Sequence, residues 1–241
     1  DKNQFIRLSW KIYNNFPSWV PPLASERKKF LNSEINPFLR ESELELFLVI
    51  SDGKVPVGRI AFIINHAHNK IYSERTGFFG MFETIDDRQV SDLLLNTTKI
   101  WCLKNKLNKL LGPVNLSTNH ECGLLVDGFD TPPVIGIPYN PEYYVDFVES
   151  WGLNKVKDLV SLRLDLIKIP EYLELGVTRL RKRNRFSIRP IRLKEFDKEL
   201  SLLAIFTYGE GPPEFGLDTL IQNAMGVLQG MISFNIQGSF R

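Results

Sequence analysis

The sequence predicts a mixed α/β domain, α+β in class, with a mostly antiparallel, twisted central sheet flanked by helices. Residues 42–64 hold two apolar runs separated by Asp52-Gly53, a dipeptide typical of a hairpin turn, which predicts two antiparallel strands. Residues 77–118 have the pattern of a strand, a polar turn, an amphipathic helix and a second strand. This order predicts a crossover between parallel strands, adjacent or with one strand between them.

The segment before residue 77 is expected to alternate between short regular elements and breaks. Residues 16–22 contain three prolines, which exclude regular helix, and Asn36-Pro37-Phe38 is a second break. The expected elements are a strand or short helix over 5–13, a short basic helix over 25–31, hairpin strands over 42–50 and 55–64, and a polar loop over 65–70.

The crossover begins with residues 77–82, an uncharged aromatic run typical of a buried strand. Asp86 or Asp87 is expected to cap the following helix, because a carboxylate accepts N–H bonds there and favours the positive end of the dipole. The next strand is expected over 110–116, with Gly112-Pro113 inside it. The expected buried stripe of the helix is Val90, Leu93, Leu94, Thr97, Ile100, Trp101 and Leu103 or Lys104.

After residue 118 the chain is rich in turn residues before it becomes regular again. Asn140 is predicted to cap a helix that has Pro141 at its first position and that stops at Gly152. The expected elements are a short strand over 135–139, a helix over 143–151, a strand over 154–166, a helix over 171–185, a strand over 187–193, a helix over 194–207 and a last helix over 215–229.

Composition restricts the function classes. The 241 residues fit one large domain, or one domain and a fragment of another, and 43% apolar content is enough for a sizeable core. A formal net charge of +2 gives no global attraction to nucleic acid or anionic membrane. Cys102 and Cys122 lack motif spacing, and no run approaches the roughly 18 apolar residues of a membrane span. A cytoplasmic protein is expected, and the start without Met suggests a trimmed or partial chain.

The order of the elements resembles the GNAT (acyl-CoA N-acyltransferase) fold, whose sheet has a parallel V-shaped split. Short phrases over about residues 5–166 resemble, more closely, an uncharacterised bacterial group of GNAT-like proteins. The matching phrases are Val20-Pro21-Pro22-Leu23, Asn36-Pro37-Phe38, His68-Asn69, Glu74-Arg75, Gly77-Phe78-Phe79-Gly80, Gly112-Pro113, Asn115, Ser117-Thr118-Asn119, Glu121-Cys122-Gly123, residues 138–141 and residues 155–159.

The resemblance implies an N-acyltransferase that moves an acyl group from acetyl-CoA or another acyl-CoA to a small-molecule amine by direct attack. It places the donor along the first crossover strand and at the start of the helix that follows. The implied cofactor-binding residues are Phe79, Gly80, Phe82, Glu83, Arg88, Gln89 and Ser91.

Two departures from the family pattern count against ordinary acetyl-CoA chemistry. Active members carry a Gln/Arg-x-x-Gly-x-Gly/Ala loop whose glycines let backbone N–H groups face the pyrophosphate. This chain has Asp86, Gln89 and Ser91 at those places and no glycine there. The family often has a tyrosine general acid in the later helix, where this chain has Val148. A fold member without catalysis, binding a ligand or partner, is therefore the alternative.

The loop over residues 115–122 is the main site candidate, since it follows a central strand and combines hydroxyl, amide, imidazole, carboxylate and thiol groups. Glu121 or His120 could act as a base, with Asn115 or Asn119 orienting a carbonyl and Ser117 lining the pocket. The structural alternative is that these side chains only satisfy the backbone of a turn. A Cys122–His120 nucleophile pair is a further alternative.

Other candidates each have a structural alternative. Tyr139, Tyr143 or Tyr144 could place a phenol in the pocket, or could pack in the core. His66 and His68 could bind a metal together with His120, but a solvated hairpin loop is the favoured explanation of such a weak motif, and no metal is expected. The basic run over 179–185 could meet RNA, although a solvated helix face is the usual reason for such a run.

The predicted domains are residues 1–167, GNAT-like, and residues 168–241, a linker helix and the incomplete start of a second GNAT-like copy. Residues 187–200 resemble the first strand and helix of such a copy. The expected partner is a small-molecule amine, with no nucleic acid and no membrane, and with a homodimer as an open alternative.

Overall fold

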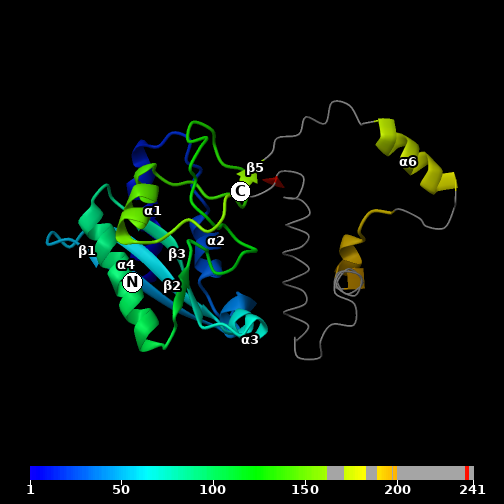
Figure 1. The fold of residues 1–241 in the computed structure, drawn as a ribbon. Helices are drawn as coiled ribbons and strands as arrows, with labels where there is room; N and C mark the ends of the chain where they lie inside the picture. Colours follow the sequence, from blue (N-terminus) through cyan, green and yellow to red (C-terminus); the bar gives the residue numbers. More distant parts are fainter. Residues whose placement is uncertain (162–170, 183–188, 197, 200–236, 239–241) are drawn as a thin grey trace. The chain divides into compact units, whose positions relative to one another are not determined.

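The structure is a computed structural model that describes residues 1–161, 171–182, 189–196, 198–199 and 237–238, in two units, 1–157 and 158–241. The first unit contains a sheet of four strands in the order β1-β2-β3-β4, visible in Figure 1. The strands are β1 (Ser42–Ile50), β2 (Pro56–Asn65), β3 (Thr76–Thr84) and β4 (Lys109–Leu111). The first three are antiparallel and β4 is parallel to β3, which confirms a mixed α/β fold.

Helices cover both faces of this sheet (Figure 1). Residues of α1 form one core with one face of β2, and residues of α4 and α5 form a second core with the other face. The helices of this unit are α1 (Lys2–Ile12), α2 (Ala24–Phe30), α3 (His66–Tyr72), α4 (Arg88–Lys104) and α5 (Tyr143–Trp151), with 3-10 turns η1 (Tyr13–Asn15) and η2 (Pro37–Arg40).

Strand β2 is buried on both faces, which explains its nearly continuous apolar sequence. Ala61 and Ile63 belong to the core that includes α1, whereas Ile60 packs with residues of α4. The Phe62 ring lies 3.6 Å from the Trp101 ring of α4, centroid to centroid. The single charged residue in this run, Arg59, is therefore placed close to the middle of the domain.

A bulge in β3 decides which face its last residues occupy. Arg59 is opposite Glu83 and Ala61 is opposite Gly80, so β3 uses one residue more than β2 over this interval. Met81, at the bulge, has a φ of 47°. Successive side chains of a strand point to opposite faces of the sheet, and the extra residue reverses this alternation for the end of β3. Glu83 therefore points to the α1 face, where it lines a cavity with Ile6 of α1.

Strands β3 and β4 separate after a short parallel pairing. The pairing runs from Thr76–Lys109 to Phe78–Leu111, and β3 then continues to Thr84. Beyond this point, individual backbone and side-chain groups of the segment after β4 form hydrogen bonds with the edge of β3. The Val114 N–H donates to the Phe79 carbonyl, and the Asn115 side chain accepts the Met81 N–H.

Helix α4 begins and ends close to the predicted limits, but only Val90 and Leu94 of its predicted stripe are buried. The buried residues are Val90, Ser91, Leu94, Leu95, Thr98 and Cys102. Leu93, Ile100 and Leu103 of the predicted stripe are more than half exposed. Gly58 of β2 leaves room for Val90 and Leu94, since an added Cβ would lie 2.6 Å from Val90 Cγ1. The sheet surface therefore selects the helix face.

The predicted polar loop over residues 65–70 is wrong, because the chain forms α3 there. Asn65 caps this helix by accepting the His68 N–H, and Ser73 ends it with a left-handed φ of 52°. An asparagine beside a polar run is thus a helix cap here and not a loop signal.

Two predictions around α5 also need correction. Asn140 does not cap the helix, which begins at Tyr143 after Glu142; the Asn140 side chain binds the backbone of Leu125 instead. Gly152 does end α5, with a φ of 115°. The predicted strand over 135–139 is absent, because that segment is irregular. Of the strand predicted over 154–166, residues 154–159 are irregular, Val160–Ser161 form a short strand, and 162–166 lie outside the described residues.

The second unit is described in separate pieces. It contains α6 (Glu171–Lys182), the 3-10 turn η3 (Leu193–Glu195) and β5 (Val160–Ser161), paired antiparallel with β6 (Gln237–Gly238). The predicted strand is absent from 189–192, and the predicted helix over 215–229 lies outside the described residues. The predicted second GNAT-like copy stays a prediction. No helix among the described residues is long and apolar enough to cross a bilayer.

Candidate functional site

A cavity of about 150 Å³ lies between the α1 face of the sheet, α2 and the segment over residues 133–139. Its lining includes four charged side chains, Arg27, Arg59, Glu83 and Glu121. The other lining residues are Ile6, Ser9, Trp19, Val20, Pro22, Phe30, Leu31, Met81, Asn115, Pro133, Ile137, Pro138 and Tyr139. Such a concentration of charge in an otherwise largely apolar cavity is the pattern of a binding or catalytic site.

Glu83 is the most buried carboxylate of this cavity, with 13% of its side chain exposed. The Tyr144 hydroxyl donates to Glu83 Oε2 at 2.9 Å and accepts the Thr84 N–H at 2.8 Å. Arg59 Nη2 lies 3.4 Å from Glu83 Oε1. Glu83 is thus held by a tyrosine on one oxygen and by a guanidinium on the other.

Burial raises the pKa of Glu83, although the Arg59 charge and the hydrogen bonds from neighbouring tyrosines act in the opposite direction. The pKa of Tyr144 is raised well above its ordinary value, first by burial and then by the nearby Glu83 charge. Tyr13 is shifted in the same direction for the same two reasons. A carboxylate with a raised pKa beside two protonated phenols accepts a proton more readily than a solvent-exposed glutamate does.

Arg59 connects this carboxylate to α1. Its Nη1 donates to the carbonyl oxygens of Phe5 at 2.6 Å and Ile6 at 3.2 Å. Its guanidinium carbon lies 5.0 Å from the centre of the Phe5 ring. Arg59 therefore fixes the helix that forms one wall of the cavity, as well as balancing the charge of Glu83.

A second ion pair closes the other side of the cavity. Arg27 of α2 binds Glu121 with both terminal nitrogens, at 3.1 and 3.2 Å. The Asn115 amide donates to Glu121 Oε2 at 3.0 Å, while its carbonyl oxygen accepts the Met81 N–H. Despite burial, the Arg27 charge and these hydrogen bonds lower the pKa of Glu121. Glu121 thus stays ionised and fully engaged.

Only some residues of the predicted site loop, 115–122, line the cavity. The Asn115 N–H donates to the Glu121 carbonyl, so the two side chains emerge together and line the cavity. Ser117, Asn119 and His120 do not line it. His120 instead contacts the Ser117 hydroxyl through Nδ1 at 2.9 Å and packs against the Phe30 ring. Burial lowers the pKa of His120.

Cys122, at the end of this loop, has a structural role. Cys122 pairs with Val114 in an isolated antiparallel bridge, and burial raises the pKa of its thiol. The Cys122 thiol is therefore in the form that does not attack. Sequence reasoning thus located the loop, and the structure separates its cavity residues from its packing residues.

The predicted cofactor residues fall into two groups. Phe79 and Phe82 are in the core with α4, and Gly80 is pressed against the Val114 backbone, so Glu83 is the only one of these four predicted residues that faces the cavity. The remaining three lie at the start of α4: Arg88 and Gln89 are exposed, and Ser91 is fully buried.

The start of α4 does not fit a pyrophosphate. The Asp87 carboxylate already accepts the Gln89 N–H at 2.8 Å and occupies the position where a phosphate oxygen would bind. Arg88 is directed to the Ser150 carbonyl at 3.4 Å and to Asp92 at 3.8 Å. The negative charge of Asp87 adds repulsion of an anion.

The three histidines do not come together as the metal hypothesis required. His66 contacts Glu43 at 3.0 Å, His68 contacts Glu74 at 3.4 Å, and His120 lies in the site loop. Within the described residues, no three His, Cys, Asp or Glu side chains are grouped as metal ligands.

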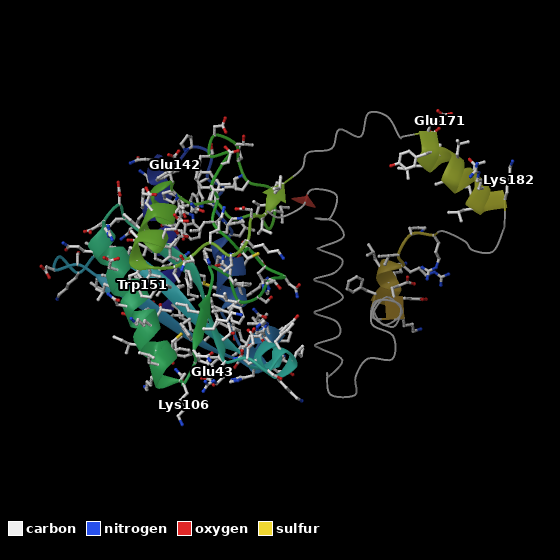
Figure 2. The ribbon with its side chains drawn as sticks, viewed as in Figure 1. Glu43, Lys106, Glu142, Trp151, Glu171 and Lys182 are labelled. Atoms are coloured by element: carbon white, nitrogen blue, oxygen red, sulfur yellow. The ribbon has the colours of Figure 1, made fainter. Side chains whose placement is uncertain are left out.

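The tyrosine candidates have different surroundings. Tyr144 is fully buried and binds Glu83, whereas Tyr143 donates to the Thr84 carbonyl at 3.0 Å. Tyr139 lines the cavity, and its hydroxyl donates to the Phe129 carbonyl. Figure 2 marks the two ends of α5, the helix of Tyr143 and Tyr144, by Glu142 and Trp151.

Sequence reasoning missed Arg59, Arg27 and Tyr13. Arg59 had a usable signal, because a lone charge within an apolar strand requires a buried partner. Arg27 belongs to a short basic helix, and Tyr13 follows an amphipathic segment; neither pattern distinguishes a site residue from a surface or core residue.

Comparisons with known proteins place this chain beside two curated relatives. It is 34% identical to Protein YghO of Escherichia coli over 213 residues, which is 87% of this chain and 53% of that protein. It is also 34% identical to the bacterial ceramide synthase of Caulobacter vibrioides over 202 residues, 83% of this chain and 52% of that protein. The chain thus spans about half the length of the curated relatives it matches. No family model and no solved structure matches it.

Proposed function

We propose that this protein is a GNAT-like N-acyltransferase that transfers an activated acyl group to the amine of a long-chain acceptor, with Glu83 as the general base. The observation behind the proposal is the buried Glu83 carboxylate, held by Tyr144 and Arg59 in a cavity next to the point where β3 and β4 separate. A parallel pair that opens in this way also supports the resemblance to the GNAT fold.

The name of one relative supplies the substrate class. That relative is named as a ceramide synthase, and a ceramide is a long-chain base with an acyl group on its amine, so the name is consistent with N-acylation. For this chain we infer the same chemistry. The amine nitrogen attacks the acyl carbonyl carbon, the new C–N bond replaces the bond to the leaving group, and the amine proton passes to Glu83.

Glu83 suits the role of the base better than the predicted alternatives. Glu121 has a lowered pKa and its oxygens are already engaged by Arg27 and Asn115. His120 does not line the cavity. Glu83 has a raised pKa and lines the cavity; Tyr144 donates to its Oε2, whereas its Oε1 contacts Arg59 at the long distance of 3.4 Å. A base needs both a matched pKa and access to the reacting proton.

The proposal names the class of the acceptor but leaves the carrier of the acyl donor open. An acyl-CoA was expected from the resemblance, but the start of α4 does not fit its pyrophosphate, because Asp87 occupies the helix N-terminus. The proposal therefore requires only an activated acyl group, such as a thioester on CoA or on a carrier protein. Acyl chains of several lengths on both carriers are the donors to test.

The experiment is an acyl-transfer assay with a long-chain amine, each donor in turn, and mass detection of the amide product. Glu83→Gln keeps the size of the side chain and removes the base, so we expect product formation to fall by at least about a hundredfold. Glu74→Gln is the control, since Glu74 is an ion-paired carboxylate outside the cavity. Normal turnover by Glu83→Gln would disprove this role.

A fold member without catalysis is the second candidate, and the start of α4 favours it, because phosphate-binding glycines are missing there. Such a protein would bind the long-chain amine and form no amide with any donor. Binding of the amine without turnover in the same assay would select this candidate.

A further inference from the structure

The mouth of the charged cavity is bordered by exposed apolar side chains. Val20 and Pro22 line the cavity, and the next residue, Leu23, is 70% exposed. On a second segment, Pro133 and Ile137 line it. Between them Ile135 is 89% exposed, the highest value among the large apolar side chains that the structure describes. We call Val20, Leu23, Val134 and Ile135 the rim.

The rim is held in place by local backbone structure. The Ile137 N–H donates to the Val134 carbonyl at 3.1 Å, and Gly136 has a φ of 84°, which makes a tight turn with Ile135 at its tip. Turn tips in water usually carry polar residues. Leu23 lies at the end of the other segment, where it follows two prolines and is the N-cap residue of α2.

The volume of the cavity limits what can enter it. A cavity of about 150 Å³ is comparable to engineered cavities that hold one benzene molecule. The amine and the few atoms around it therefore fit, but an aliphatic chain of a long-chain acceptor does not. Such a chain has to leave through the mouth, where it meets the rim.

We propose that the rim inserts into the surface of a lipid bilayer, so that an acceptor reaches Glu83 while its aliphatic chain stays in the lipid. The size argument rests on the proposed function. Two separate uncharged segments converge on one cavity mouth, which fits a shallow peripheral insertion. The sequence led us to expect no membrane partner, but a contact of this kind needs neither a spanning helix nor a high net charge.

Sedimentation with phosphatidylcholine vesicles, prepared without acceptor or donor, tests the rim directly. We expect the protein to bind, and a Leu23→Asp/Ile135→Asp variant to lose at least about tenfold in partitioning. Raising the salt concentration from about 0.15 M to 0.5 M is expected to change binding little, because the contact is apolar. Ile100→Asp is the matched control, as Ile100 is 67% exposed on α4, away from the cavity lining.

Three results would overturn the proposal. The first is that the unchanged protein does not bind vesicles. The second is that Ile100→Asp loses as much vesicle partitioning as the rim variant. The third is that sedimentation equilibrium shows a dimer of the chain that the rim substitutions dissociate. Thermal unfolding of the variants checks that they are folded. Glu83→Gln is expected to bind vesicles like the unchanged protein while it loses activity. Normal turnover by this variant, with vesicle binding retained, would reject the proposed role of Glu83 and leave the lipid contact standing.

Discussion

The hydroxyl of Tyr144 joins the fold to the proposed chemistry, so Tyr144→Phe is the most informative single change. This hydroxyl accepts the Thr84 N–H at 2.8 Å and donates to Glu83 Oε2 at 2.9 Å. Tyr144 and Thr84 are both fully buried. Phenylalanine keeps the ring and its contact with Phe82, so the change removes little besides these two hydrogen bonds and a longer contact of 3.2 Å with the Thr84 carbonyl oxygen.

The expected cost follows from these two bonds. An unsatisfied buried N–H costs about 1–3 kcal/mol, and a hydrogen bond to a charged group contributes about 1.5–3 kcal/mol. Because the two effects share one atom and are not additive, we expect the free energy of unfolding to fall by about 2–4 kcal/mol. Urea denaturation of the whole chain, followed by tryptophan fluorescence, measures this fall.

The loss should also depend on pH. The Tyr144 hydrogen bond lowers the pKa of Glu83, so its removal raises that pKa further. An acid with a raised pKa in the folded state stabilises the fold at low pH and loses that contribution as pH rises from 4.5 through the folded pKa. The deficit of Tyr144→Phe is therefore expected to grow with pH over this interval, and the acid limb of activity to move to higher pH.

Tyr143→Phe provides the control for this experiment. Its hydroxyl donates to the Thr84 carbonyl oxygen, but it neither accepts the Thr84 N–H nor donates to Glu83, as the Tyr144 hydroxyl does. A single neutral hydrogen bond contributes about 0.5–1.5 kcal/mol, so this variant should lose less and show no pH dependence from Glu83. Equal losses in the two variants, or a deficit of Tyr144→Phe that is flat with pH, would refute the reasoning.

Two further changes test the framework around the site. Gly80→Ala would place a Cβ against the Val114 carbonyl oxygen and 3.0 Å from Asn115 Oδ1, so we expect the free energy of unfolding in urea to fall by about 3 kcal/mol. Gly53→Ala is the control, because the nearest neighbour of its added Cβ is 3.9 Å away and the change should cost almost nothing. Similar losses in the two variants would argue against the close approach at Gly80. The Thr76 hydroxyl and Lys109 lower the pKa of Glu74 to about 2, so its contribution to stability is complete above pH 4.5 and is lost as pH falls toward 2. Unfolding midpoints measured over that range should fall less steeply in Glu74→Gln, and parallel curves would contradict the assignment.

The sequence predicted the framework well wherever a local signal is sufficient. The hairpin turn at Asp52-Gly53, the capping of α4 by Asp87 and the end of α5 at Gly152 are set by residues close to the turn or helix end. The buried face of α4 was predicted only in part, because its apolar residues fit two overlapping stripes. The choice between them depends on Gly58, 36 residues before Leu94, and no helical pattern contains that information.

The site was predicted in part, for a related reason. Asn115, Glu121, Tyr139 and Glu83 were all named from the sequence and all line the cavity. Their roles could not be read, because a pKa depends on burial and on partners from distant segments. Glu121 appeared to be a free base, yet Arg27, 94 residues away, neutralises it.

The bulge in β3 shows how a single residue can decide the chemistry. With strict alternation from Phe78, residue 83 would lie on the α4 side, where Phe79 and Phe82 pack. The extra residue at Met81 turns Glu83 toward the α1 side and sets it opposite Arg59. A carboxylate in the α4 core would have no cation beside it and would cost far more to bury. The bulge therefore permits a buried acid at this point of the sheet, and the charge in β2 that looked out of place in the sequence is its counterpart.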